Sequence, residues 1–241
     1  WIFFSWLRLA RAIHFGLFGG QEFSDTAPMT DRAKKKQGPD YSFESEAGAP
    51  SSYVVGVDEA GRGPLVGPVV AAAVRLRPEA IPDGLNDSKK LSEVKREALF
   101  ALIMQSSDVG VAASSPQQID TLNIHHATLD AMARAVAALP QRPDHILVDG
   151  KFTPPTNLSA QAIIKGDGRS LSIAAASIVA KVTRDRILVE LDATYPGYGW
   201  KQNKGYPTKS HKEALLRLGV TPEHRKSYAP IRNMLSPTDS K

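Results

Sequence analysis

The amino-acid sequence predicts an α/β fold: a mixed β-sheet flanked by helices, with a helical extension at the C-terminal end. Short runs rich in Val, Ala and Ile predict strands buried on both faces of a sheet. Longer segments between them place apolar residues at helical spacing. The first two strands form a hairpin and the later ones alternate with helices, which together indicate a mixed sheet.

Five segments have the pattern of strands. A Gly-rich turn joins the first two, and a Pro-rich loop at 151–157 separates the last two. The expected strands are residues 53–58, 68–76, 108–114, 145–150 and 161–167.

The helices are predicted from apolar periodicity and from Pro and Gly at their ends. Pro140 ends the second helix, Pro196 follows the third, and Gly219 closes the fourth. A further helix is expected to open at Thr221-Pro222, since Thr caps helices and Pro suits their first turn. The other expected helices are residues 93–105, 121–139, 170–194 and 209–218.

Residues 1–52 differ in composition from the rest and are predicted to be a flexible extension before a domain of residues 53–241, whose helical part starts at about 195. The apolar start is interrupted by Arg8, Arg11 and His14, so it lacks the ~18 uninterrupted apolar residues of a membrane span. It also lacks a clear signal-peptide cleavage site. The preferred hypothesis is that residues 1–28 are not native and Met29 is the start; a transit or interfacial segment is the alternative.

Composition limits the chemistry. The 241 residues include no cysteine, which excludes disulfides, zinc–thiolate sites and a thiol nucleophile, and fits a cytoplasmic protein. Net charge is +5, but residues 1–150 carry −3 and residues 151–241 carry +8. This asymmetry suggests a polyanionic partner held near a metal-binding acidic centre, although a solvated basic face explains it equally well.

Three of the predicted strands carry acids at their ends, directly after an apolar run: Asp58-Glu59, Asp149 and Asp167. If these strands are neighbours, four carboxylates meet at one edge of the sheet, and their repulsion requires cations. Oxygen ligands favour Mg²⁺ or Mn²⁺ over zinc. Two such ions about 4 Å apart suit in-line displacement at phosphorus, one generating hydroxide and one stabilising the leaving oxygen. Any one of these acids alone is better explained as a turn or cap residue.

An ordered set of motifs carries a family resemblance. "GVDEAGRGPLVGPVVAAAV", "NDSKKLS", "ILVDG", "IIKGDGRSLSIAAASIVAKVTRD", "NKGYPTKSH" and "HRKSYAPI" resemble the motifs of prokaryotic type 2 ribonuclease H, ribonuclease HII, over residues 53–235. The resemblance implies a ribonuclease H-like fold with a C-terminal helical extension. It also implies Mg²⁺- or Mn²⁺-dependent hydrolysis of RNA in RNA–DNA hybrids and incision 5′ of single ribonucleotides in duplex DNA, leaving 3′-hydroxyl and 5′-phosphate ends.

The resemblance also implies roles for individual residues. Backbone amides of a Gly-Arg-Gly loop would bond the 2′-hydroxyl and its arginine a phosphate, while a tyrosine would pack on the sugar after the ribonucleotide. On the residues alone, that tyrosine reads as a loop aromatic and the glycines as hairpin residues. The metal-binding and catalytic acids fall on Asp58, Glu59, Asp149 and Asp167, the loop on Gly61, Arg62 and Gly63, and the tyrosine on Tyr206.

Lys89, Lys181 and Arg184 are further candidates for phosphate contacts, and each could equally be a solvated cation. His125 and His126 lie on a predicted helix away from the acids, and a structural role is favoured. Two other classes stay open: a metal-dependent DNA nuclease or resolvase with a similar sheet, and a non-catalytic hybrid-binding module. Residues 1–52 lack the length and strand pattern of the N-terminal domain of ribonuclease HIII, which favours ribonuclease HII. We expect the protein to be a monomer that binds RNA–DNA hybrids and ribonucleotide-containing duplex DNA. No association with a membrane is expected.

Overall fold

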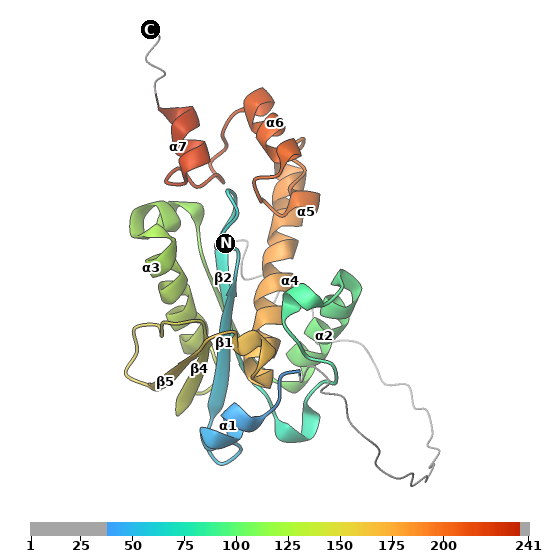
Figure 1. Ribbon diagram of the computed structural model, residues 1–241, viewed down its shortest axis with the longest axis vertical. Helices are drawn as coiled ribbons and strands as arrows, with labels where there is room; N and C mark the ends of the chain where they lie inside the picture. Colours follow the sequence, from blue (N-terminus) through green and yellow to red (C-terminus); the bar gives the residue numbers. More distant parts are fainter. Residues whose placement is uncertain (1–37, 237–241) are drawn as a thin grey trace, which may run out of the picture. The chain divides into compact units, whose positions relative to one another are not determined.

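The structure, a computed structural model, describes residues 38–236 (Figure 1). A five-stranded sheet carries helices on both faces, and three short helices follow the longest one. The strands are β1 Val54–Ala60, β2 Val69–Arg75, β3 Asp108–Ser114, β4 His145–Asp149 and β5 Ser159–Ile163. The helices are α1 Ser42–Glu46, α2 Glu93–Ser106, α3 Pro116–Ala137, α4 Leu171–Thr194, α5 Trp200–Asn203, α6 Lys209–Leu218 and α7 Ala229–Leu235.

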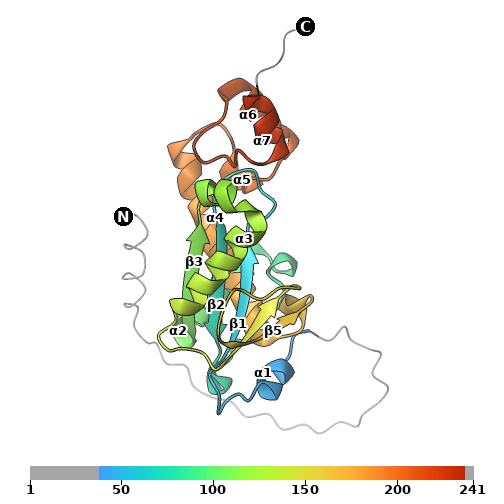
Figure 2. The same ribbon diagram turned by 90° about the vertical axis from the view of Figure 1, so that its left-hand side faces the viewer.

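The sheet is mixed, as the sequence predicts. Its strand order is β3-β2-β1-β4-β5, in which β1, β2 and β3 pair antiparallel while β1, β4 and β5 pair parallel. Helix α3 covers one face, and α4 with α2 covers the other (Figures 1 and 2). The central strand β1 is therefore buried between two helical layers, and polar groups at its end are partly shielded from water.

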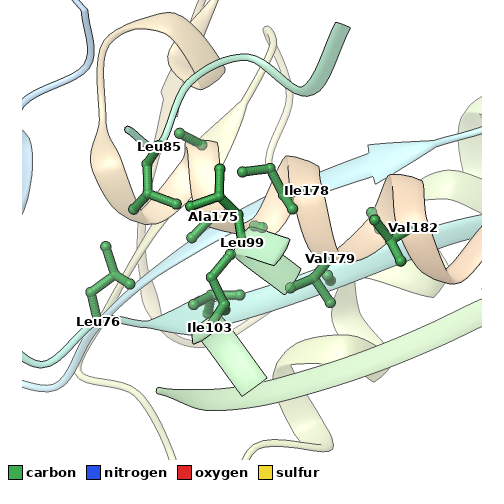
Figure 3. Packing of buried hydrophobic residues seen from close by; sticks show 13 residues of the cluster. Leu76, Leu85, Leu99, Ile103, Ala175, Ile178, Val179 and Val182 are labelled. Carbon is green, nitrogen blue, oxygen red and sulfur yellow. The ribbon is translucent and has the colours of Figure 1, made fainter. Parts of the chain in front are cut away.

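Close packing of α4 against β1 fixes the geometry of the second layer. Gly56 in β1 makes this possible, since a Cβ there would lie 2.2 Å from the backbone carbon of Ser172. Ala175, Ile178 and Val179 of α4 pack with apolar residues of β2 and α2 in one buried cluster (Figure 3). Small residues on α4 let the helix lie close to the sheet, so its N-terminal end is held beside the end of β1.

Residues 38–52 belong to the compact domain, which differs from the boundary predicted near residue 52. Glu44 of α1 is buried, and its Oε1 accepts hydrogen bonds from Ser170 Oγ, Ser172 N and Ser172 Oγ. These donors lie at the start of α4, where free amides favour an acidic partner. Helix α1 thus caps α4 from a distance of more than 120 residues in sequence. The hypotheses about residues 1–28 and Met29 lie outside the described residues.

Strand β5 and the helix expected at Thr221-Pro222 differ from the prediction. Strand β5 ends at Ile163, so Asp167 lies in a 3₁₀ turn, Gly166–Gly168, and not at a strand end as expected. The turn is possible because Lys165 adopts a left-handed conformation. The helix expected at Thr221-Pro222 is a turn, because the Thr221 backbone N–H and hydroxyl bond to His224 Nδ1 and the chain does not continue as a helix.

Helix α3 is longer than predicted and is kinked. It begins at Pro116, and Asn123 inside it has non-helical backbone angles. Asn123 Oδ1 accepts the backbone amides of His125 and His126, so it caps the second part of the helix. Within residues 38–236, no helix is both long and apolar enough to span a bilayer.

The C-terminal helical part has its own small core. Trp200 is fully buried there, with Tyr198 stacked on it at 4.8 Å and Leu65 of the β1–β2 loop packed into the same cluster. The helical extension is therefore attached to the loop that follows the central strand, and its residues are positioned relative to the end of the sheet.

Candidate active site

Asp58 and Asp149 are brought together by the parallel pairing of β1 and β4. The last paired residues of the two strands are Val57 and Val148, and each aspartate is the next residue along its strand. Parallel strands end at the same edge of a sheet, so the two carboxylates lie side by side. The sequence prediction that these acids meet at one sheet edge is confirmed for this pair.

Asp167 joins this pair from the turn that precedes α4. Gly166 N donates a 2.7 Å hydrogen bond to Asp149 Oδ1, which ties the turn to the end of β4. Gly166 is packed so closely that a Cβ would lie 2.7 Å from Ile173. Glycine at this position thus lets the turn pack against α4, where the turn places the Asp167 carboxylate beside the other two.

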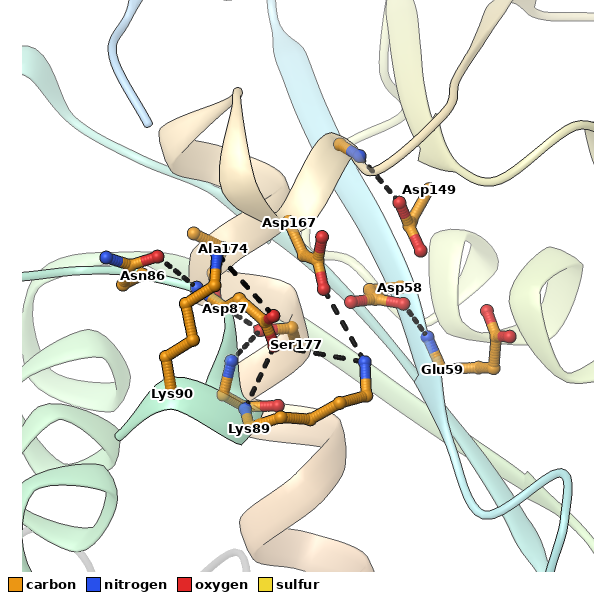
Figure 4. A network of polar contacts seen from close by, with 12 residues as sticks. Asp58, Glu59, Asn86, Asp87, Lys89, Lys90, Asp149, Asp167, Ala174 and Ser177 are labelled. Atoms are coloured by element: carbon orange, nitrogen blue, oxygen red, sulfur yellow. Dashed lines mark hydrogen bonds and ion pairs between the residues drawn. The ribbon is translucent and has the colours of Figure 1, made fainter. Parts of the chain in front are cut away.

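Oxygen atoms of Asp58, Asp149 and Asp167 all lie within 4.8 Å of one another (Figure 4). Asp58 and Asp167 are buried, with 4% and 8% of their surface exposed. A cluster of three aspartates without a cysteine or histidine ligand is the donor set preferred by hard divalent cations such as Mg²⁺ or Mn²⁺. The residues present therefore fit such a metal.

The Glu59 carboxylate is not part of this three-oxygen cluster. Neighbouring residues on a strand point to opposite faces, and Asp58 pairs with Ala72 on the α4 face whereas Glu59 pairs with Ala71 on the α3 face. Glu59 Oε1 lies 3.3 Å from Arg62 Nη1, and Figure 4 shows its side chain directed away from Asp58. Three carboxylates therefore meet at the sheet edge and not the four expected, and the Glu59 carboxylate lies outside their cluster.

The electrostatics of the cluster are those of a site that needs a cation. Burial, then the charges of Glu59, Asp149 and Asp167, raise the pKa of Asp58 well above its ordinary value. Burial and the charge of Asp149 also raise the pKa of Asp167. Burial raises the pKa of Glu59, and Arg62 opposes this change. Bound cations would remove these costs, since they favour the ionised carboxylates.

Lys89 is the protein's own cation at this cluster. Its Nζ lies 3.6 Å from Asp167 Oδ2 and 3.8 Å from Asp87 Oδ1, and its side chain is largely exposed. Partial burial opposes the change, but the charges of Asp87 and Asp167 raise the pKa of Lys89. Asp87, which the sequence analysis did not single out, also bonds the backbone N–H of Lys89 and so fixes this turn.

The loop after β1 is shaped by glycines and by the buried side chain of Arg184. Gly61 has φ +96°, and a Cβ there would lie 2.0 Å from Arg184 Nε. Only glycine fits this position, because the backbone has a positive φ and any side chain would clash with buried Arg184. The glycine is thus needed for the fold itself, whether or not a substrate approaches the loop. Arg62 and Gly63 are exposed at the surface beside the cluster.

Tyr206 lies next to the same loop although it is far away in sequence. A Cβ on Gly63 would lie 3.5 Å from the Tyr206 ring, which is 45% exposed. The Tyr206 carbonyl accepts a hydrogen bond from Nδ1 of buried His211, whose Nε2 accepts the Trp200 indole N–H. Tyr206 is therefore a half-exposed ring beside the Gly61–Gly63 loop, and its backbone is hydrogen-bonded to the buried core of the helical extension.

Arg184, predicted as a phosphate contact, is in the interior. It is 1% exposed, and its guanidinium donates to the carbonyl oxygens of Val66, Pro68 and Lys204. The prediction of a direct phosphate contact is wrong, because the donors are already used within the fold. Lys181, one turn earlier on α4, is partly buried and forms a 2.8 Å ion pair with Asp185.

A ribonuclease H-like sheet with an aspartate cluster at the ends of its central strands defines a class of metal-dependent nucleases. Residues 55–231 match the model of the family described as ribonuclease HII. The chain belongs to the ribonuclease HII family and is a metal-dependent ribonuclease, a hydrolase.

Individual relatives agree with this assignment. Proteins called ribonuclease HII from Ruegeria pomeroyi and Cereibacter sphaeroides are 54% and 57% identical over 199 residues, which cover 82% of this chain and 85% and 94% of those proteins. The crystal structure of the ribonuclease H2 from Pyrococcus horikoshii OT3 superposes with a TM-score of 0.65 at 29% identity. The superposition covers 75% of this chain and 96% of the Pyrococcus horikoshii chain.

Proposed function

We propose that this protein is an endoribonuclease that hydrolyses the RNA strand of RNA–DNA hybrids and incises duplex DNA 5′ of single embedded ribonucleotides. The products would carry 3′-hydroxyl and 5′-phosphate ends. The observation that carries the proposal is the buried aspartate cluster beside an exposed loop and a half-exposed tyrosine. A catalytic centre next to a surface that can contact the sugar suits an enzyme that binds ribose selectively and cuts beside it.

Within this proposal the acids would hold the metal ions at the position of the scissile phosphate. Asp58, Asp149 and Asp167, with Glu59 beside them, would hold one or two Mg²⁺ or Mn²⁺ ions. The bound ions would activate the attacking water and stabilise the leaving oxygen. Lys89, whose exposed amine already lies at the cluster, would contact a phosphate of the substrate.

The surface beside the acids reads the substrate. The backbone amides of Arg62 and Gly63 bond the 2′-hydroxyl, the group that distinguishes RNA from DNA, and the Arg62 side chain contacts a phosphate. The Tyr206 ring packs on the sugar that follows the ribonucleotide, where a 2′-hydroxyl would crowd it. Lys181, ion-paired as it is, stays a weaker candidate for a phosphate contact.

One assay separates this function from its alternatives. The protein is incubated with a duplex containing one ribonucleotide, an all-DNA duplex of the same sequence, and a continuous RNA–DNA hybrid, each with Mg²⁺ or with EDTA. We expect Mg²⁺-dependent cutting of the first and third only. Cutting of the all-DNA duplex would indicate a DNA nuclease or resolvase, and binding without cutting would indicate a hybrid-binding module. A monomeric state and a cytoplasmic location stay predictions.

A further inference from the structure

Arg225 is a buried arginine that faces backbone carbonyls of the loop after β1. It is 0% exposed, and its guanidinium donates to the carbonyl oxygens of Gly61 at 2.6 Å, Arg62 at 2.9 Å and Gly67 at 2.8 Å. Tyr228 adds a second contact, because its hydroxyl donates to the Arg62 carbonyl and accepts from Arg225 Nη1. One guanidinium therefore holds both carbonyls of the Gly61–Arg62 segment.

The carbonyls held by Arg225 determine where the amides point. In a planar trans peptide, the C=O of one residue and the N–H of the next point in opposite directions. With the carbonyls of Gly61 and Arg62 turned inward to Arg225, the N–H groups of Arg62 and Gly63 point outward. Neither of these two N–H groups donates to an acceptor within residues 38–236, and both residues are exposed. The loop thus presents two adjacent donors to the solvent beside the aspartates.

Arg225 itself is held in place by other elements. Its backbone N–H donates to the Leu65 carbonyl at 2.9 Å. Asp120 of α3 accepts the backbone N–H groups of Lys226 and Ser227, at 3.0 and 2.8 Å. The turn that carries Arg225 is therefore hydrogen-bonded both to the loop after β1 and to helix α3.

We propose that Arg225 is a positioning residue for ribose recognition: by holding the Gly61 and Arg62 carbonyls, it aims the Arg62 and Gly63 amides at the 2′-hydroxyl. The inference deepens the proposed function and rests on it. A planar guanidinium is required, because its five donors can bond three carbonyls at once, whereas a lysine ammonium is a single point of charge on a flexible stem. A purely structural role for Arg225 would stabilise the fold without affecting the choice between ribose and deoxyribose.

The test compares Arg225→Lys with Leu99→Ala, a core truncation in α2 away from the loop. Two quantities are measured at a temperature where both variants and the parent are folded by circular dichroism. The first is the ratio of affinities for a duplex with one ribonucleotide and the same duplex without it. The second is the rate at which trypsin cuts after Arg62, which reports the loop conformation without any activity.

We expect Arg225→Lys to lower the affinity ratio about tenfold or more, since the donors are no longer aimed, and to speed trypsin cutting after Arg62. Leu99→Ala should lower the melting temperature but leave the affinity ratio unchanged. Asp120→Ala, which loosens the turn without touching the loop, should lower the ratio by a smaller factor. An affinity ratio equal to the parent's in Arg225→Lys overturns the proposal, whatever the ratio in Asp120→Ala.

Tyr228→Phe separates the two side chains. It removes the hydroxyl's hydrogen bond to the Arg62 carbonyl and the bond that the hydroxyl accepts from Arg225 Nη1, but it leaves every bond from Arg225 to the loop carbonyls, so the ratio should change less than about threefold. Tyr198→Phe, which removes a hydroxyl bond to the Gly219 carbonyl, is the matched control. A loss as large as that of Arg225→Lys would overturn the assignment to Arg225. If the parent itself does not prefer the ribonucleotide duplex, the proposed function fails; if it does and Arg225→Lys keeps the preference, only the positioning role fails.

Discussion

Asp58→Asn should make the metal-free protein more stable while it removes a metal ligand. Asp58 lies in a cluster whose carboxylate oxygens are within 4.8 Å of one another. At an effective dielectric constant of about 20, two unit charges at that distance repel by about 3.5 kcal/mol. The substituted amide keeps the oxygen that accepts the Glu59 N–H, so the main change is loss of the charge.

Proton binding limits the gain. At pH 7 the native protein can bind a proton on one aspartate, which costs about 4 kcal/mol for a carboxyl of ordinary pKa and sets an upper limit on the repulsion that remains. The Lys89 ammonium also offsets part of this repulsion. We therefore expect Asp58→Asn to raise the free energy of unfolding by about 2–4 kcal/mol, which for a domain of this size raises the melting temperature by about 4–16 °C.

The assay is thermal unfolding in EDTA at several pH values. Because burial and neighbouring charges raise the pKa of Asp58 above its unfolded value, its cost is present at neutral pH and disappears as the pH falls toward the unfolded pKa. The advantage of Asp58→Asn should shrink accordingly. Asp83→Asn, at an exposed position outside the cluster, is the control. Saturating Mg²⁺ should stabilise the parent more than the variant. An unchanged or lower melting temperature of Asp58→Asn in EDTA at pH 7 would refute the reasoning.

Three further predictions concern other parts of the chain. Glu44→Ala should lower the free energy of unfolding by about 2–3 kcal/mol in urea, because it removes the hydrogen bonds to the start of α4, while Glu46→Ala, exposed on the same helix, should change it little. Burial and the nearby His211 lower the pKa of His224 to about 4, so its neutral form belongs to the folded state. Stability from His224 is therefore full above about pH 6.5 and lost as the pH falls toward 4; His224→Gln should reduce this pH dependence in urea titrations, and an identical pH dependence would contradict it. Tyr206→Ala should slow cleavage at an isolated RNA–DNA junction by roughly one to two decades without weakening metal binding, and a parental rate in single-turnover kinetics would leave Tyr206 as a loop aromatic.

Much of the fold follows from local patterns in the sequence. The strand at 108–114 and the helix at 209–218 have the predicted bounds, because apolar runs and end signals are local properties. The meeting of Asp58 and Asp149 was predictable for a related reason. Each comes directly after a buried apolar run on its strand, and parallel strands end at one edge of the sheet. Asp167 lies in the cluster as predicted, but in a turn and not at the end of a strand. Glycines and the left-handed conformation of Lys165 form this turn where a strand was expected.

What the sequence did not reveal depends on contacts between distant segments. The docking of α1 relies on Glu44 meeting Ser170 and Ser172, and no local pattern predicts that pair. Arg184 looks like a surface cation on a helix, and only the loops folded around it show that its donors are used by carbonyls. The direction of Glu59 could have been predicted, because strand alternation places it opposite Asp58.

In the proposed function, the aspartate cluster performs the cutting while other residues bind the substrate. Asp149→Asn tests it most directly, because Asp149 joins the cluster and its side chain also accepts the Gly166 N–H, a bond that the asparagine oxygen can keep. The measurement is Mg²⁺-dependent cleavage and affinity, side by side, on a duplex with one ribonucleotide. We expect no cleavage and a nearly unchanged affinity; substantial Mg²⁺-dependent cleavage by the purified variant would show that the aspartate cluster is not the catalytic centre.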